Sequence, residues 1–237
     1  MLLYLIRHGA PDYAADSLRE EGRAQARKAA NRLAKGGIHE IHSSPMGRAR
    51  QTAEPAADKL GLPVIIEPWA FELGEECMTT FPDGKKKTIA ALPPEYLHQA
   101  AFRRMDSQEG LRKIPAVAET GLGTRWEALI NGLDGMLEKL GFRRNADGLY
   151  DVIAPDERHI ALFCHAGMLC VVLAHLLDLP YHLLASSMLC PYTGITVLDF
   201  PAFRPAVSPV LLTFGDVGHL YDSDALPQSL YASGRQF

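Results

Sequence analysis

Short apolar runs alternate with helical patterns through the first 66 residues, and this alternation constrains the fold more than any other feature of the chain. The runs at residues 2–6, 38–42 and 64–66 have the apolar character of strands buried in a parallel sheet. Between them, small apolar residues recur on one helical face from Ala26 to Leu33 and again from Ala49 to Leu60. This alternation predicts a three-layer α/β protein, in which helices cover both faces of a mostly parallel central sheet.

Local signals predict where two of the helices begin and where one of them ends. Ser17 and Glu20 have the spacing of a capping box, and so do Thr124 and Glu127. This spacing predicts that one helix begins just after Ser17 and another just after Thr124. The second helix carries a long apolar face, and Gly141 stands where it should end.

The alternation stops between about residues 73 and 157. This stretch contains the long amphipathic helix and, at 142–151, a segment with the pattern of a β-hairpin. It is too long to be a plain crossover, so we interpret it as a helical and hairpin insertion over the carboxyl edge of the sheet. Residues 1–237 then form a single domain with a core of residues 1–72 and 158–221. The pattern in the second part of the core predicts strands at 160–164, 195–200 and 210–214 and a helix at 168–179.

Composition narrows the class of protein. Apolar residues make up 47% of the chain and charged residues 22%, as in an ordinary soluble globular protein. The net charge of −4 argues against a surface built to follow nucleic-acid phosphates, and no apolar run approaches the roughly 18 residues of a membrane span. The chain does not begin with the basic segment of a signal peptide, and its four cysteines form no CxxC pair. We therefore expect a cytoplasmic protein with no nucleic-acid or membrane partner.

The nine histidines do not form a pattern of metal ligands. The chain has no HExxH motif, and no group of Cys and His residues has the spacing of a zinc site. We therefore expect neither a metal nor a cofactor. No feature of the sequence indicates an oligomeric state.

Three of the predicted strands are followed by residues that carry charge or can take part in catalysis. Arg7 and His8 follow the first strand, Arg48 comes shortly after the second, and His165 lies between the fourth strand and a helix. The carboxyl ends of parallel strands share one edge of the sheet, so we expect these four side chains to converge on one pocket. Gly9 allows a sharp turn of the backbone and the close approach of a ligand.

Such a pocket suits a small anion that carries several negative charges. Guanidinium groups match phosphate oxygens in a bidentate manner, and a neutral imidazole can act as a nucleophile. The helix that follows His165 adds free N–H groups and the positive end of its dipole. Phosphoryl transfer needs mainly positioning and neutralisation of charge, which arginines can supply where other phosphatases use metal ions. The residues therefore predict phosphate-ester chemistry, with one histidine attacking phosphorus.

The chain contains, in this order, the motifs R-H-G at residues 7–9, S-S-P…R-A-R-Q-T-A at 43–53 and C-H-A-G at 164–167. Together they resemble the histidine phosphatase superfamily, which is also called the phosphoglycerate mutase-like fold. The resemblance covers residues 1–72 and about 158–221.

The resemblance implies a role for each residue of the predicted pocket. His8 would be the nucleophile that becomes phosphohistidine. Arg7, Gly9, Arg48 and His165 would bind the phosphate, and His165 would also stabilise the transferring group. The small-molecule partner implied by this set is a phosphate ester. One difference is that the Asn which the superfamily often carries a few residues after R-H-G is absent here.

The resemblance also implies a general acid, which in this superfamily is a carboxylate after the third strand. Glu72 stands at this point and would protonate the leaving alkoxide and then activate water. The usual spacing is not kept here, because Leu73-Gly74-Glu75-Glu76 follows, so Glu75 and Glu76 are alternatives. We favour Glu72, because a position at a strand end gives a better-defined geometry than a loop.

The expected function is that of a metal-independent phosphomonoesterase, which hydrolyses a small phosphorylated metabolite through phosphohistidine. One alternative is a mutase that moves phosphate between positions of one substrate, as phosphoglycerate mutases do. The segment after R-H-G lacks the longer polar stretch of those mutases, which favours the hydrolase. The other alternative is a catalytically silent phosphate-binding member. It is disfavoured because the full set of Arg7, His8, Arg48 and His165 is present.

Overall fold

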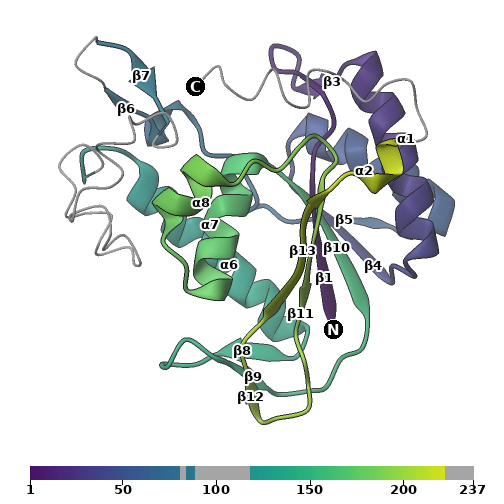
Figure 1. The fold of residues 1–237 in the computed structure, drawn as a ribbon, viewed down its shortest axis with the longest axis vertical. Coiled ribbons are helices and arrows are strands. Elements are labelled where there is room, and N and C mark those ends of the chain that lie inside the picture. The colour runs from purple at the N-terminus through teal and green to yellow at the C-terminus, as the bar shows by residue number, and fades with distance from the viewer. Residues whose placement is uncertain (81–83, 89–117, 222–237) are drawn as a thin grey trace.

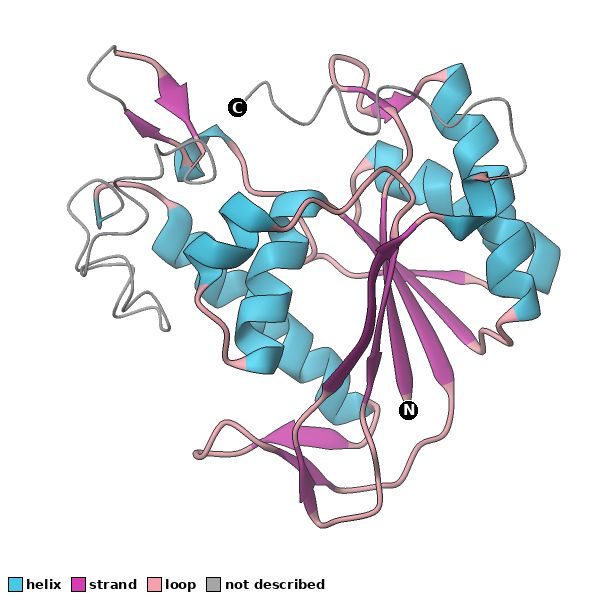
Figure 2. Cartoon of the chain, in the orientation of Figure 1, coloured by secondary structure: helices cyan, strands magenta, loops and turns pink. Residues whose placement is uncertain are grey.

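The protein is built around one six-stranded sheet with helices on both faces (Figures 1 and 2). The structure, a computed structural model, describes residues 1–80, 84–88 and 118–221. The strand order is β13-β11-β1-β10-β4-β5, and β1, β10, β4 and β5 are parallel to one another. Only β11 runs antiparallel to both of its neighbours in this sheet. The strands are β1 (Leu2–Arg7), β4 (Glu40–Ser43), β5 (Val64–Ile66), β10 (His159–Cys164), β11 (Ile195–Asp199) and β13 (Val210–Asp216).

Two hydrophobic layers explain why the central strands are apolar along their whole length. On one face, Ile6 of β1 packs with the apolar sides of α1 (Glu20–Lys35) and α2 (Gly47–Leu60). On the other face, Leu3 and Leu5 pack with α6 (Leu122–Lys139) and α7 (Ala166–Leu177), beside which lies α8 (Tyr181–Ser187). Because both faces of the sheet are covered, Leu3, Leu5 and Ile6 are all completely buried although they point to opposite faces of β1. This confirms the predicted three-layer α/β architecture with a mostly parallel sheet.

Both predicted capping boxes are wrong, because tertiary contacts determine where the helices begin. Ser17 belongs to a small hairpin of β2 (Pro11–Asp12) and β3 (Ser17–Leu18), and α1 begins at Glu20 without a side-chain cap. In the second case, the N–H of Gly121 donates to the carbonyl of Glu76, and α6 begins at the next residue. Thr124 therefore lies inside that helix.

The predicted hairpin at 142–151 exists, but it does not lie over the carboxyl edge of the sheet. β8 (Phe142–Arg144) and β9 (Tyr150–Val152) form a separate three-stranded sheet with β12 (Ala206–Val207). The ring of Phe142 lies 5.3 Å from that of Phe200, whose N–H bonds to the carbonyl of Met1. The hairpin is thus at the amino end of β1 (Figure 1). α6 runs the length of the core and ends on this side of the sheet. The hairpin follows α6 directly in the chain, so it lies there as well.

The parallel register aligns the ends of β1, β4 and β10 at the carboxyl edge of the sheet, opposite the hairpin. Arg7 is paired with Cys164, and Phe163 is paired with Ser43. The residues that follow these positions, His8, His165 and Ser44, are therefore neighbours. The short helix η1 (Glu75–Cys77) and the hairpin of β6 (Thr79–Thr80) and β7 (Lys86–Lys87) also lie toward this edge (Figure 1). None of the helices within the described residues is long and apolar enough to cross a membrane.

Candidate active site

His8 and His165 lie side by side at the carboxyl edge, with their ring centroids 5.3 Å apart. The N–H of His8 donates to the carbonyl of Cys164, which fixes the two strand ends against each other. Both histidines are buried, and the positive charges of Arg7 and Arg48 reach both of them. The structure thus brings together the four side chains that the sequence pattern placed at one edge.

The ring of His8 is held in one tautomer. Its Nδ1 lies 2.8 Å from the carbonyl oxygen of Gly9. A carbonyl can only accept a hydrogen bond, so Nδ1 carries the proton and Nε2 keeps its lone pair. Burial, together with the neighbouring guanidinium of Arg7, lowers the pKa of His8 to about 3. The ring is therefore a neutral base whose free nitrogen is available to attack an electrophile.

This arrangement predicts that His8 does not titrate in the physiological range. Because its pKa is lowered to about 3, the ring should gain a proton only in strong acid. We expect its NMR signals, assigned by comparison with the His8→Ala spectrum, to stay constant between about pH 5 and pH 8. A titration of His8 with its midpoint near the ordinary value of about 6.5 would contradict the assigned environment.

Each arginine has one anchoring contact and keeps other N–H groups for a ligand. Nη1 of Arg7 donates to the carbonyl of Cys190 over 2.6 Å, and Nη1 of Arg48 donates to Asp16 Oδ1 over 2.6 Å. The Nε atoms of both are buried and have no hydrogen-bond partner among the described residues. Buried N–H donors without a partner cost free energy, and a bound phosphate would satisfy such donors.

Asp16 is part of the site although the sequence pattern gave no role to it. Its carboxylate accepts the N–H of Gly47 over 2.6 Å as well as Nη1 of Arg48, so it lies at the N-terminus of α2. The backbone of Asp16 is left-handed, with φ at 45°. A Cβ at position 47 would come within 2.2 Å of the Asp16 carbonyl, so this contact requires the glycine. No local pattern in the sequence links Asp16 to Gly47, so the sequence alone did not indicate this contact.

Replacing Asp16 should separate its role in the backbone from its charge. Asp16→Ala removes the cap of α2 and forces an alanine into a left-handed conformation, so we expect the free energy of unfolding to fall by about 2 kcal/mol. Asp16→Asn keeps the acceptor and tolerates that conformation, so it should cost less than about 1 kcal/mol. Urea unfolding of the two variants measures the difference. Equal stability of the alanine and asparagine variants would contradict this account.

His165 is the residue that directly precedes α7, and its ring is completely buried. Its Nε2 lies 2.7 Å from Ser44 Oγ, which already accepts the N–H of Met46. Ser44 has its own proton to donate to Nε2, and in that arrangement the ring proton is on Nδ1. This Nδ1 is buried without a partner among the described residues. Burial and the charges around it hold the pKa of His165 well below its usual value, so it is a neutral N–H donor.

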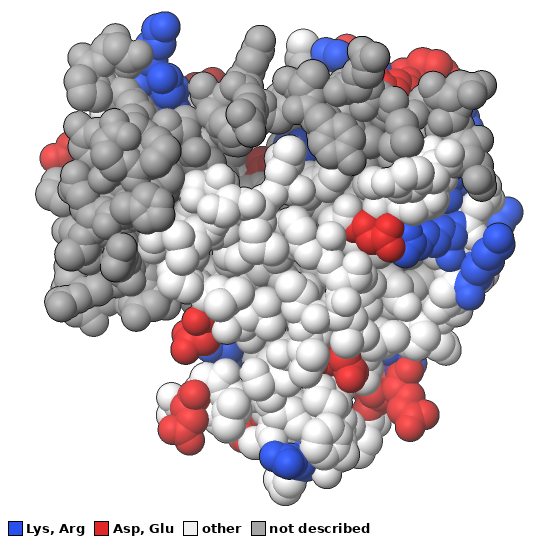
Figure 3. Space-filling view, viewed as in Figure 1, with Lys and Arg blue, Asp and Glu red and all other residues white. Residues whose placement is uncertain are grey.

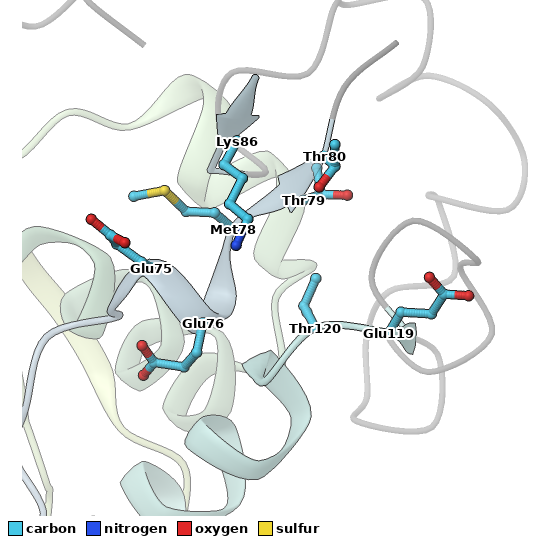
Figure 4. Close-up of a pocket in the computed structure, with 8 residues that line it drawn as sticks. All are labelled: Glu75, Glu76, Met78, Thr79, Thr80, Lys86, Glu119 and Thr120. Carbon is cyan, nitrogen blue, oxygen red and sulfur yellow. The ribbon is translucent and has the colours of Figure 1, made fainter. Parts of the chain in front are cut away.

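The three candidate acids occupy different places. The Glu72 carboxylate accepts the N–H groups of Gly167 and Met168, at 3.3 and 2.9 Å, in the first turn of α7 beside His165. Glu75 and Glu76 instead line a separate pocket of about 260 Å³ between η1, β6 and the start of α6 (Figure 4). Of the three carboxylates, Glu72 is the one bonded to the N-terminus that follows His165.

Two further side chains that the sequence pattern did not single out hold the loop after β1. Thr52 Oγ1 accepts the N–H of Gly9 over 3.0 Å, and Gln25 Oε1 accepts the N–H of Ala10 over 2.8 Å. Gly9 also packs directly on Gly22, because a Cβ at position 9 would lie 2.7 Å from the Gly22 carbonyl. The loop that carries His8 is therefore fixed by both α1 and α2.

The positive charge of the site is local. On the face shown in Figure 3, the visible Lys and Arg side chains are mixed with Asp and Glu and form no continuous basic stripe. Within residues 1–80, 84–88 and 118–221, no group of three His, Cys, Asp or Glu side chains is placed to hold a metal ion. The charge that faces a ligand at the site itself comes from Arg7 and Arg48.

The chain is similar to known proteins in sequence and in fold. The family model of the histidine phosphatase superfamily (branch 1) matches residues 3–133. The probable phosphoglycerate mutase GpmB of Yersinia pestis (strain Pestoides F) is 30% identical, over 95% of this chain and 97% of that protein.

Solved structures show the same fold. Phosphoserine phosphatase from Entamoeba histolytica, in complex with 3-phosphoglyceric acid, superposes with a TM-score of 0.59 at 20% identity. That match covers 92% of this chain and 98% of the other. The mycobacterial glucosyl-3-phosphoglycerate phosphatase in complex with VO3 gives a TM-score of 0.58 at 22% identity, covering 90% and 98% of the two chains.

Proposed function

The chain belongs to the histidine phosphatase superfamily and is an enzyme of that kind, and from this premise we propose that it is a metal-independent phosphomonoesterase. It would hydrolyse a small phosphorylated metabolite through a phosphohistidine formed on His8. The observation that carries the proposal is the state of His8, a buried neutral imidazole with a free Nε2 beside two guanidinium groups.

In the first step, Nε2 of His8 attacks phosphorus and forms a P–N bond while the ester P–O bond breaks. Arg7, Arg48 and Nδ1 of His165 donate hydrogen bonds to the phosphoryl oxygens and neutralise their charge. The carboxyl group of Glu72, held at the N-terminus of α7, gives its proton to the leaving alkoxide.

In the second step, water attacks phosphorus and the P–N bond breaks. The Glu72 carboxylate takes a proton from the attacking water, and the electron pair of the P–N bond returns to Nε2. Inorganic phosphate leaves, and His8 is again neutral. The carbonyl of Gly9 holds the proton on Nδ1 throughout, so the same nitrogen is regenerated for the next cycle.

A mutase is the second candidate, because the GpmB relative is described as a probable phosphoglycerate mutase. A mutase would return the phosphoryl group from His8 to another hydroxyl of the substrate instead of giving it to water. The names of two structural neighbours contain a phosphorylated three-carbon acid, free in 3-phosphoglyceric acid and joined to glucose in glucosyl-3-phosphoglycerate. We therefore propose three-carbon phosphate monoesters as the first substrates to test.

The test is a panel of phosphate esters assayed in EDTA, with phosphate release and isomer interconversion followed in the same samples by ³¹P NMR. We expect phosphate release without interconversion of 2- and 3-phosphoglycerate. Interconversion that outpaces release would favour the mutase. If neither occurs and inorganic phosphate still binds, the silent phosphate-binding member would be favoured.

We also place the enzyme in the cytoplasm. All four cysteines, Cys77, Cys164, Cys170 and Cys190, are buried free thiols. Free thiols in this number are typical of a reducing compartment. A disulfide in protein isolated from the native source would argue against this placement.

A further inference from the structure

Two tyrosines lie against the two arginines of the candidate phosphate pocket. The guanidinium carbon of Arg7 lies 4.2 Å from the ring centroid of Tyr192, and that of Arg48 lies 5.5 Å from the ring centroid of Tyr13. Both rings also lie beside the candidate nucleophile, with centroids 5.9 Å and 6.4 Å from the His8 ring. The two rings therefore lie beside the same three side chains, those of Arg7, His8 and Arg48.

Tyr192 is held in place by an unusual turn. The next residue, Thr193, is completely buried and has a left-handed backbone with φ at 55°. Its N–H donates to the carbonyl of His8 over 3.3 Å, and its Oγ1 donates to the carbonyl of Tyr192 over 2.7 Å. Nε2 of His219 lies 3.0 Å from the same hydroxyl. A non-glycine residue keeps such a conformation only where its surroundings impose it, so the position of Tyr192 is built into the fold.

Tyr13 lies in the turn between β2 and β3, and the hydrogen bonds of this turn hold it in place. Oδ1 of Asp12 accepts the N–H groups of Ala14 at 3.0 Å and Ala15 at 3.3 Å, which closes the turn. Asp16 at the end of the turn is bonded to α2 and to Arg48. Tyr13 is nevertheless 62% exposed, so one side of its ring faces solvent while the other covers Arg48.

Each arginine has a single anchoring hydrogen bond among the described residues, through Nη1. This bond and the covalent link at Nε hold two points of the planar guanidinium, but they do not fix the rotation of its plane about the line that joins them. A ring face against the guanidinium fixes its plane, and with it the direction of the remaining N–H groups.

We propose that Tyr13 and Tyr192 are positioning residues, an aromatic clamp that orients Arg48 and Arg7 toward the phosphoryl group. The inference rests on the proposed function in one respect, that these arginines bind phosphate. It assigns to Tyr13 and Tyr192 a role that depends on their ring faces and not on their hydroxyl groups.

The experiment compares phosphate binding by phenylalanine and leucine variants of each tyrosine. Tyr192→Leu should weaken the binding of inorganic phosphate about 10-fold, and Tyr13→Leu about 3-fold because its ring is more exposed and farther from the guanidinium. Tyr192→Phe and Tyr13→Phe keep the ring face and should bind phosphate within about 2-fold of wild type. Calorimetric titration with inorganic phosphate measures these values without any need for turnover. Tyr221→Leu is the matched control for Tyr13→Leu, because Tyr221 is 63% exposed and, among the described residues, its ring contacts neither arginine nor His8.

Thermal unfolding of the same variants separates positioning from stability. The clamp is supported if leucine weakens phosphate binding and phenylalanine restores it while the two variants unfold at similar temperatures. It is overturned if Tyr192→Leu binds phosphate like wild type, or if Tyr192→Phe loses as much affinity as Tyr192→Leu. Wild-type protein that binds no phosphate would overturn both this inference and the proposed function. The expected binding pattern without hydrolysis of any ester would overturn the hydrolase alone.

Discussion

His8→Ala is expected to lower kcat for phosphate-ester hydrolysis by about 10⁴-fold or more, because it removes the atom that forms the P–N bond. The loss should appear in kcat and not only in KM, since Arg7, Arg48 and His165 remain to bind the phosphate. Within the part of the chain that the structure describes, the His8 ring has one hydrogen bond, to the carbonyl of Gly9, so the variant should still fold. Phosphate release in EDTA and a thermal unfolding curve measure the two effects.

His39→Ala is the matched control for this variant. His39 is exposed, and its Nδ1 accepts the N–H of His159 next to the amino end of β10. We expect wild-type rates from it. If His8→Ala retained more than a few per cent of the wild-type rate, a covalent route through His8 would be ruled out.

Glu72→Gln is expected to lower kcat for alkyl phosphates by about 10²- to 10⁴-fold, because the amide can neither protonate the alkoxide nor accept a proton from water. The amide oxygen of glutamine can still accept the N–H of Met168, so the side chain should stay in place. With p-nitrophenyl phosphate, whose leaving group needs no proton, formation of phosphohistidine should remain fast while its hydrolysis is slow. Phosphohistidine should therefore accumulate and be detectable as an acid-labile ³²P label.

Glu75→Gln and Glu76→Gln are the matched controls. Both side chains line the separate pocket of Figure 4, and Glu76 is already paired with Arg125 at 2.8 Å. Their rates should stay within a few-fold of wild type. If Glu76→Gln were impaired for alkyl esters and Glu72→Gln were not, the acid would have been assigned to the wrong residue.

The strands of the central sheet are the part of the fold that residue patterns predict well. Buried parallel strands have apolar residues on both faces, so β1 and β10 were predicted within about one residue of their observed bounds. The bounds of β5 were also predicted from its apolar run, although β5 is an edge strand in which Ile65 and Ile66 are exposed. Because parallel strands end at a common edge, the convergence of His8, Arg48 and His165 also followed from the sequence. Pairing of the parallel strands brings the ends of these strands together. Such strands can be recognised in the sequence from their apolar runs.

The features that sequence reasoning missed depend on contacts between distant segments. Asp16 caps α2, which begins 31 residues later at Gly47, and no local pattern links the two. The β8–β9 hairpin was recognised but placed at the wrong edge, because its location depends on the direction of α6 across the sheet. Tyr192 carries no such signal, because it precedes β11, whereas the predicted site residues come after the ends of strands.

The direction of β11 affects how this pocket can change over evolution. β11 is the strand that runs against its neighbours, so it enters the sheet at the carboxyl edge while β1, β4 and β10 leave it there. Extra or missing residues between the end of α8 and Cys190 are absorbed ahead of that strand, so they shift neither the register of the other strands nor the contacts that Cys190 and Thr193 make with the site. The segment that leads to Tyr192 can therefore be lengthened or exchanged among descendants of one ancestor while His8 and His165 stay where they are. Substrate range and catalytic chemistry are thereby free to diverge at different rates.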